Sequence, residues 1–362
     1  MIWILIYISM GVVGLYAAYG LFIFLGFYLI PSGKKKNEDF KFISVIIPFR
    51  NEEKNLSRLL ESLQNLSYPS DKYEIIFIND HSTDKGVWII ENSPVPSLLI
   101  HNKESGKKNA IELGVSQATG EWIACTDADC ILPPTWLKSI NQSDGEMILG
   151  PVELNTKGTG ILALQEIEWA ALQAISASMC FWKKPVMNNG ANLAYRKNEY
   201  DSNALKKQTA SGDDIFMLEH FRNKKLKVRF NWLTGALVKT EASKMFSELI
   251  NQRVRWASKS KYYTRKENIV LGLLIASVNI VVMIALLNIV LWNPTSIFFS
   301  MVLLTKIMAD ITFTLPYFIL TQKPYLVLWV PFFALIYPFY YVIVLARSIQ
   351  GKYSWKERNY HA

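Results

Sequence analysis

Hydrophobic residues are distributed unevenly along this chain. Residues 2–30 contain no charged side chain and residues 269–346 contain almost none, whereas residues 40–265 mix apolar and polar positions as a water-soluble domain does. A membrane-spanning helix needs about 20 apolar residues. The first region therefore predicts one spanning helix. The last region predicts three more, at 269–292, 297–320 and 325–346.

The region between the apolar ends predicts an α/β domain. Apolar runs short enough to be buried strands occur at 42–48, 73–79, 97–101, 122–125 and 146–152. Segments with helical spacing of apolar residues occur at 52–66, 106–117 and 161–181. We expect Asn51 to cap the first of these helices. Strands that alternate with helices predict a doubly wound sheet, in which ligands bind beyond the carboxyl ends of the strands.

An amphipathic helix is predicted just before the C-terminal apolar region, at 243–263. Its apolar side holds Met245, Phe246, Leu249, Ile250 and Val254, and its other sides hold Gln252, Arg253, Arg255 and Lys259. Beside a membrane span, this pattern is typical of a helix on the membrane surface. The predicted parts are a membrane helix (1–30), a soluble domain (40–240), an interfacial helix (241–265), membrane helices (266–348) and a basic tail (349–362).

Basic residues predict the orientation of the chain. Three lysines at 34–36 follow the first apolar segment, so the positive-inside rule places the next domain in the cytoplasm, in a bacterium at the inner membrane. Three further crossings would put the basic residues between 347 and 358 on the opposite face, against the same rule. Either the middle apolar segment, in which Lys306 and Asp310 can pair, is re-entrant, or the rule fails here.

Composition restricts the possible partners. The net charge is +9, and the basic residues gather at 34–36, 222–229 and 253–266, near the apolar regions. This placement suits an anionic membrane face and a polyphosphate ligand. No nucleic-acid-binding module accompanies the charge, so nucleic acid is not an expected partner. The three cysteines, Cys125, Cys130 and Cys180, have neither zinc-site spacing nor an even number, which favours reduced thiols.

Polar clusters follow three of the predicted strands, at 48–52, 80–84 and 127–129. Side chains at i and i+2 of a strand point the same way, so Asp127 and Asp129 can direct two carboxylates to one point. Such ligands suit Mg²⁺ or Mn²⁺, which complete their coordination with substrate phosphates. Taken alone, an Asp-x-Asp is more often turn or cap chemistry. A single pocket that collects all three clusters would favour the metal.

Six motifs occur in a fixed order between residues 42 and 260: VIIPFRNEE at 45–53, NDHSTD at 79–84, GKKNA at 106–110, TDAD at 126–129, GDD at 212–214 and QRVRW at 252–256. Together they resemble the family 2 glycosyltransferases, in particular the membrane-embedded branch of cellulose, chitin and hyaluronan synthases and ceramide glucosyltransferases. QRVRW fits the family's Gln-x-x-Arg-Trp in full. NDHSTD departs from Asp-Asp-Gly-Ser-x-Asp at two positions, and GKKNA matches its counterpart imperfectly.

The resemblance implies a GT-A type α/β domain that binds a nucleotide sugar, flanked by transmembrane helices. It implies that Asp129, together with Asp127, holds Mg²⁺ or Mn²⁺, and that Asp214 is the general base of an inverting reaction. Residues implied for the nucleotide sugar are Pro48, Arg50, Glu52, Asp80, Lys107, Asp127 and Arg255. Residues implied for the acceptor are Gln252, Trp256 and Asp213. For Trp256 the competing interpretation is a membrane-interface anchor.

Three functions remain open at this point. The first is a single transfer of sugar from a UDP-sugar to a membrane lipid, which the interfacial helix and the short membrane bundle favour. The second is a processive polysaccharide synthase, although about four apolar segments are few for enclosing a polar channel. The third is a catalytically inactive membrane scaffold, against which the metal pair and Asp214 argue.

Overall fold

The computed structural model describes residues 2–30, 39–156, 160–206, 212–259, 262–263, 265–291, 295–350, 352–355 and 358–361. The three lysines at 34–36 lie outside the described residues. Of the predicted basic tail beyond residue 350, the backbone is described as strands β10 (Lys352–Trp355) and β11 (Arg358–His361).

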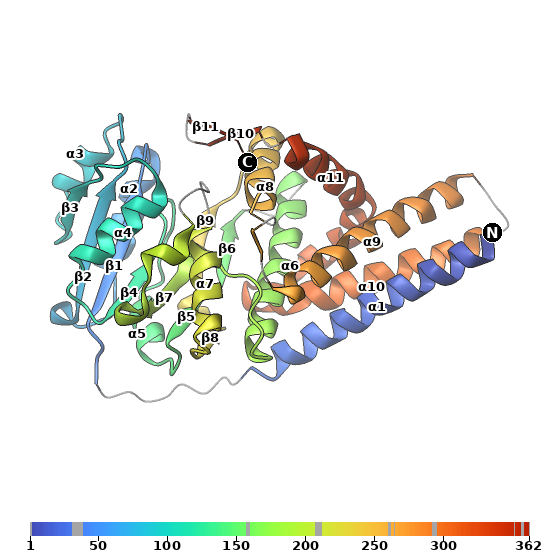
Figure 1. Cartoon of the computed structure of the whole chain (residues 1–362), viewed down its shortest axis with the longest axis horizontal. Coiled ribbons are helices and arrows are strands. Elements are labelled where there is room, and N and C mark those ends of the chain that lie inside the picture. The colour runs from blue at the N-terminus through green and yellow to red at the C-terminus, as the bar shows by residue number, and fades with distance from the viewer. Residues whose placement is uncertain are drawn as a thin grey trace.

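A mixed sheet forms the centre of the domain that follows the first helix (Figure 1). Within the described residues it has seven strands in the order β3-β2-β1-β4-β7-β5-β8. These are β1 (Ile43–Phe49), β2 (Tyr73–Asn79), β3 (Leu98–His101), β4 (Trp122–Cys125), β5 (Met147–Leu149), β7 (Leu193–Arg196) and β8 (Val228–Phe230). Only β7 runs antiparallel to its neighbours in the described sheet. Because β1, β2 and β4 are parallel, their carboxyl ends meet at one edge. Strands β6 (Val152–Asn155) and β9 (Val238–Glu241) pair separately.

Helices cover both faces of the sheet. Val45 and Ile47 of β1 belong to a core shared with α2 (Glu53–Gln64), α3 (Gly86–Glu91) and α5 (Trp136–Asn141). Ile46 points to the other side and belongs to a core shared with α4 (Lys107–Gln117) and α7 (Asp213–Asn223). A strand buried on both faces requires the nearly continuous apolar run seen in the sequence. The GT-A type α/β architecture is confirmed.

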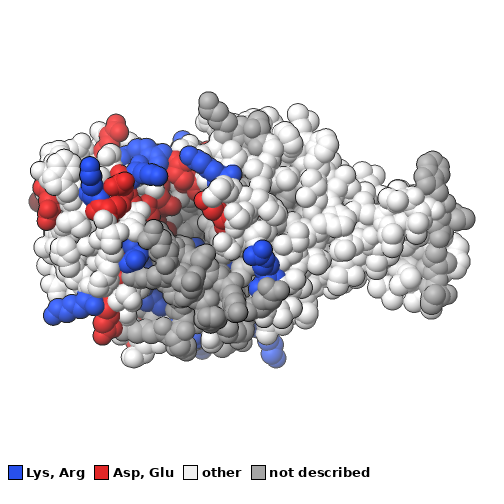
Figure 2. Space-filling view, turned by 90° about the horizontal axis from the view of Figure 1, so that it is seen from above, with Lys and Arg blue, Asp and Glu red and all other residues white. Residues whose placement is uncertain are grey.

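Four helices of the described chain are long and apolar enough to cross a membrane. They are α1 (Ile2–Tyr28), α9 (Lys266–Val290), α10 (Ser296–Leu320) and α11 (Val330–Gln350), the last preceded by the turn η7 (Pro324–Trp329). Helix α6 (Ile161–Phe181) packs against α1 and α10 and joins them to the sheet. In Figure 2, charged side chains gather over the sheet domain, while the projecting helices show none on this face. This distribution supports association with a membrane.

Three local predictions are wrong. The run at 146–152 forms two strands, because Gly150 and Pro151 interrupt it and proline has no N–H for a ladder. Asn51 does not cap α2, because its φ is 51° and its side chain accepts a hydrogen bond from the Thr83 N–H at 2.9 Å. The amphipathic helix, α8, is shorter than predicted and covers only Phe246–Ala257.

Candidate active site

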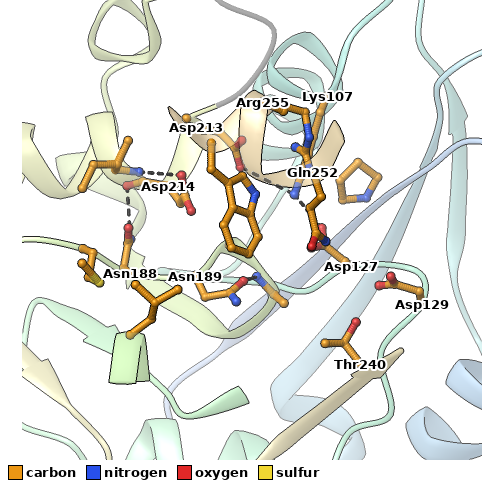
Figure 3. Close-up of a pocket in the computed structure, with 18 of the residues that line it drawn as sticks. Lys107, Asp127, Asp129, Asn188, Asn189, Asp213, Asp214, Thr240, Gln252 and Arg255 are labelled. Carbon is orange, nitrogen blue, oxygen red and sulfur yellow. Dashed lines mark hydrogen bonds and ion pairs between the residues drawn. The ribbon is translucent and has the colours of Figure 1, made fainter. Parts of the chain in front are cut away.

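One cavity of about 390 Å³ opens where β1, β2 and β4 end. Every residue predicted from the sequence for the site lines it: Pro48, Arg50, Glu52, Asp80, Lys107, Asp127, Asp129, Asp213, Asp214, Gln252, Arg255 and Trp256. Figure 3 shows Asp127 and Asp129 on one side and Asp214 with Asn188 on the other. The fold therefore brings together motifs that are up to about 200 residues apart in the sequence.

The polar motifs after β1 and β2 hold each other in place. Arg50 Nη1 donates hydrogen bonds to the carbonyl oxygens of Asp80 and His81, both at 3.0 Å. Asp80 is buried, and its Oδ1 accepts from the Gly106 N–H at 2.8 Å, which fixes the loop before α4. His81 occupies the position of the family's glycine, and its φ of 61° is a conformation that glycine adopts without strain. The departure from the motif thus keeps the backbone shape of the turn.

Lys107, at the start of α4, connects two acidic motifs. Its Nζ lies 2.6 Å from Asp127 Oδ1 and 3.8 Å from Asp213 Oδ2. Burial alone would lower the pKa of Lys107, but the two carboxylates raise it above the ordinary lysine value. A Cβ at Gly190 would lie 3.3 Å from Asp213 and 3.5 Å from Lys107 Nζ. A small residue at 190 therefore leaves room for this ionic cluster in the cavity wall.

The acidic pair stands at the start of α7. Gly212, with a φ of 100°, makes the turn into the helix. Asp214 Oδ1 accepts from the Ile215 N–H at 2.7 Å and lies 3.7 Å from Lys259 Nζ. Asn188 Nδ2 donates to the Asp214 carbonyl oxygen at 3.1 Å. A helix N-terminus stabilises carboxylates, but both aspartates also face the cavity, which a capping role alone does not require.

The donor set at the end of β4 fits a divalent ion that a substrate completes. Among the described residues, no group of three or more His, Cys, Asp or Glu side chains could enclose a metal. Mg²⁺ commonly takes one or two protein carboxylates together with substrate phosphates. Asp129 and Asp127, both lining the cavity, supply that number.

Helix α8 places the last motif over the cavity. Gln252, Arg255 and Trp256 line it, while Arg253 points away into the protein and is 5% exposed. Arg253 Nε and Nη2 lie 2.8 and 2.7 Å from Glu168 Oε2 on α6. Arg253 Nη1 donates to Gln252 Oε1, and the guanidinium carbon lies 4.3 Å from the centre of the Trp256 ring. Arg253 therefore touches two of the three motif residues.

Comparison with known proteins assigns the chain to a family. Residues 44–143 match the sequence profile of "Glycosyl transferase family 2". These residues carry a family 2 glycosyltransferase domain. This glycosyltransferase is 24% identical over 284 residues to the probable glycosyltransferase YdaM of Bacillus subtilis. The alignment covers 72% of this chain and 67% of YdaM.

Two further relatives match shorter regions. An undecaprenyl-phosphate 4-deoxy-4-formamido-L-arabinose transferase of Photorhabdus laumondii is 37% identical over 27% of this chain and 32% of its own length. The beta-monoglucosyldiacylglycerol synthase of a Nostoc species is 27% identical over 39% of this chain and 31% of its own length. The chain thus spans about a third of these two relatives.

The fold of this glycosyltransferase matches a solved structure over nearly its whole length. A mannosyltransferase from Pyrobaculum calidifontis, in complex with GDP-Man and Mn²⁺, aligns with a TM-score of 0.56. The alignment covers 96% of this chain and 98% of that chain, at 14% sequence identity. The similarity therefore includes the helices outside the sheet domain and supports a shared fold.

Sequence reasoning missed several residues that shape the site of this glycosyltransferase. The cavity wall formed by α6 includes Trp169, Leu172, Gln173 and Ser176. Glu168 on the same helix holds Arg253, and the Trp169 and Trp256 rings lie 5.8 Å apart. Glu168 and Trp169 belong to no sequence motif. The only signal in the sequence was the presence of two acidic residues, Glu166 and Glu168, in a mostly apolar helix.

Proposed function

We propose that this chain is a metal-dependent, inverting glycosyltransferase. It moves a sugar from a UDP-sugar to a hydroxyl group of a membrane lipid, at the cytoplasmic face of a bacterial inner membrane. The observation that carries the proposal is the single cavity in which Asp127 and Asp129, Asp214 and Trp256 face one another. The cavity wall on α6 belongs to the helix that packs against α1 and α10.

Residues at the ends of β1, β2 and β4 would bind the donor. Asp80 and Arg50 shape the polar end of the cavity, where a nucleoside fits, and Pro48 and Glu52 line it beside them. Arg255 offers a planar set of donors to a diphosphate. A divalent ion held by Asp129 and Asp127 would supply Lewis-acid stabilisation of the leaving diphosphate.

Asp214 would act on the acceptor. A hydroxyl that attacks the anomeric carbon must lose its proton, and a carboxylate within hydrogen-bond reach can accept it. Asp214 Oδ1 is held by the Ile215 N–H, so we assign the proton to Oδ2. Attack opposite to the leaving diphosphate inverts the anomeric centre.

The membrane side of the cavity supports a lipid acceptor. Trp169 and Leu172 on α6 and Trp256 on α8 give it apolar walls. Two relatives carry a lipid in their names: the undecaprenyl-phosphate 4-deoxy-4-formamido-L-arabinose transferase and the beta-monoglucosyldiacylglycerol synthase. The second name describes a sugar on a diacylglycerol, as a hydroxyl acceptor would give. A processive polysaccharide synthase is the second candidate, because Gln-x-x-Arg-Trp is typical of such enzymes. A scaffold without activity is the third.

Release of nucleoside diphosphate by the purified protein in lipid tests the proposal. Donors would include UDP-glucose, UDP-N-acetylglucosamine, UDP-galactose and UDP-glucuronate, together with GDP-mannose because the Pyrobaculum mannosyltransferase was solved with GDP-Man. Each would be run with Mg²⁺ or Mn²⁺, with wild type and with Asp214→Asn. The expected result is metal-dependent release from a UDP donor, reduced about 10²–10⁴-fold by the substitution.

The product distinguishes the candidates. A single glycolipid product supports transfer to a lipid, whereas a ladder of polymer lengths would identify a processive synthase. Exclusive use of GDP-mannose would overturn the choice of UDP. Cellular function retained by the combination of Asp214→Asn and Asp129→Ala would instead identify a scaffold.

A further inference from the structure

The last apolar helix, α11, begins beside the catalytic domain. The segment before it is fixed by Lys323, whose Nζ lies 2.8 Å from Glu153 Oε1 on β6 and 2.5 Å from Glu166 Oε1 on α6. Leu326 in η7 and Val330 at the start of α11 are fully buried, in the same core cluster as residues of α6 and β6. The start of α11 is therefore anchored to the sheet domain.

The second half of α11 returns to the same domain. Tyr340 and Val344 pack against Ile250 and Val254 of α8, the helix that carries the Gln-x-x-Arg-Trp motif. The Tyr340 hydroxyl also lies 3.5 Å from Glu168 Oε2. After α11, the backbone of β10 again lies against α8. Both ends of this helix thus contact elements of the catalytic domain.

A helix that crosses a bilayer cannot have both ends on one side. With 21 residues, α11 is about 32 Å long, enough to cross a hydrocarbon core of about 30 Å. In Figure 1, however, α1, α9 and α10 reach the outer end of the bundle, while α11, which packs against α8, α9 and α10, does not. The core at that outer end, built from Ile6, Val13, Val281, Ala285, Phe299 and Val302, includes no described side chain of α11.

One side of α11 is exposed and apolar. Its exposed large residues are Phe332, Leu335, Ile336, Phe339, Val342, Ile343, Leu345 and Ile349. Soluble surfaces rarely show an apolar patch of this extent. Exposed apolar residues of α9, such as Ile269, Val270 and Leu273, belong to the end of α9 nearest the catalytic domain. The same bilayer that surrounds α9 would therefore cover α11.

We propose that α11 lies in the headgroup boundary of the leaflet next to the catalytic domain and does not cross the bilayer. The chain then crosses three times, through α1, α9 and α10, and its N-terminus is on the far side. The basic residues from Arg347 to Arg358 stay on the catalytic side, as the positive-inside rule requires. Because α11 packs on α8, it also holds the helix of Trp256 at the membrane surface.

Cysteine labelling tests the topology. The native cysteines are buried and give the background in wild type. Single variants would be Ser70→Cys in the catalytic domain, Leu291→Cys at the outer end of α9 and Ser354→Cys after α11. A membrane-impermeant maleimide applied to intact spheroplasts should label Leu291→Cys alone, and the other two only after permeabilisation. Labelling of Ser354→Cys from outside would overturn the proposal.

Depth in the bilayer separates an interfacial helix from a spanning one. A nitroxide on Phe339→Cys, at the middle of α11, should lie about 5–10 Å below the headgroups by oxygen and nickel accessibility. Ile280→Cys, near the middle of α9, is the matched control and should lie near the bilayer centre, about 15 Å deep. Equal depths at the two positions would show that α11 spans the membrane and would refute the inference. A nitroxide at 339 exposed to water would refute it as well.

Discussion

The ion pair between Arg253 and Glu168 can be tested by removing one charge. Glu168→Gln keeps the size of the side chain but leaves the Arg253 guanidinium buried without its carboxylate partner. The Arg253 side chain is 5% exposed and the Glu168 side chain is 13% exposed. Breaking a buried pair from one side costs about 3–5 kcal/mol. Gln252 and the Trp256 ring still contact Arg253, so we expect the lower end, about 3 kcal/mol of stability.

The pair should also affect the acceptor more than the donor. When Arg253 loses Glu168, its contacts with Gln252 and Trp256 relax. These two residues line the cavity, and we propose that they bind the acceptor. We expect the acceptor KM to rise several-fold while the donor KM is unchanged. The assay combines thermal unfolding of the protein in lipid with steady-state kinetics in which each substrate is varied in turn.

Two controls make the result decisive. Glu199→Gln removes one partner of the surface pair with Lys224 and should cost less than about 1 kcal/mol. The double replacement of Glu168 and Arg253 by Met should be less destabilising than the sum of its single changes, because well-packed apolar residues can replace a buried pair. The reasoning is refuted if Glu168→Gln behaves like Glu199→Gln, or if the losses are simply additive.

Three further predictions concern single residues. Lys107→Met leaves Asp127 and Asp213 without the cation between them, so the two carboxylates should weaken binding of the donor about tenfold, measured by titration calorimetry. Unchanged binding would contradict a role of Lys107 in holding the donor. Asp129→Asn should raise the metal concentration needed for half-maximal diphosphate release at least tenfold, and an unchanged requirement would exclude Asp129 as a ligand. Burial and the charge of Arg196 lower the pKa of Lys41 to about 8, against about 10.4 when unfolded. Between these two pH values the unfolded state binds more protons than the folded state, so the free energy of unfolding should rise from pH 8 to pH 10. The melting temperature should therefore rise over this range in the wild type and rise less in Lys41→Met. An equal rise in both proteins would refute the lowered pKa of Lys41.

The sequence alone determined the apolar ends, the strands β1, β2 and β4, and the motif residues of the cavity wall. These features are local, because a strand buried on both faces must be continuously apolar and polar side chains after parallel strands must meet at one edge. The short strands β7, β8 and β9 escaped prediction. Each has only three or four residues and contains a charged one, so none shows the apolar run that marks the equally short β4, and β7 runs antiparallel to its neighbours.

Only the tertiary structure decided the partners of the motif residues and the course of α11. Arg253 and Glu168 are 85 positions apart, and nothing in the local pattern links them. By length and hydropathy, both α9 and the segment Pro324–Ile349, which contains most of α11, are candidate spans. Lys323 before the helix and Tyr340 within it hold α11 through contacts with segments that are distant in the sequence. Hydrophobic periodicity indicates that a residue is buried but not which segment buries it.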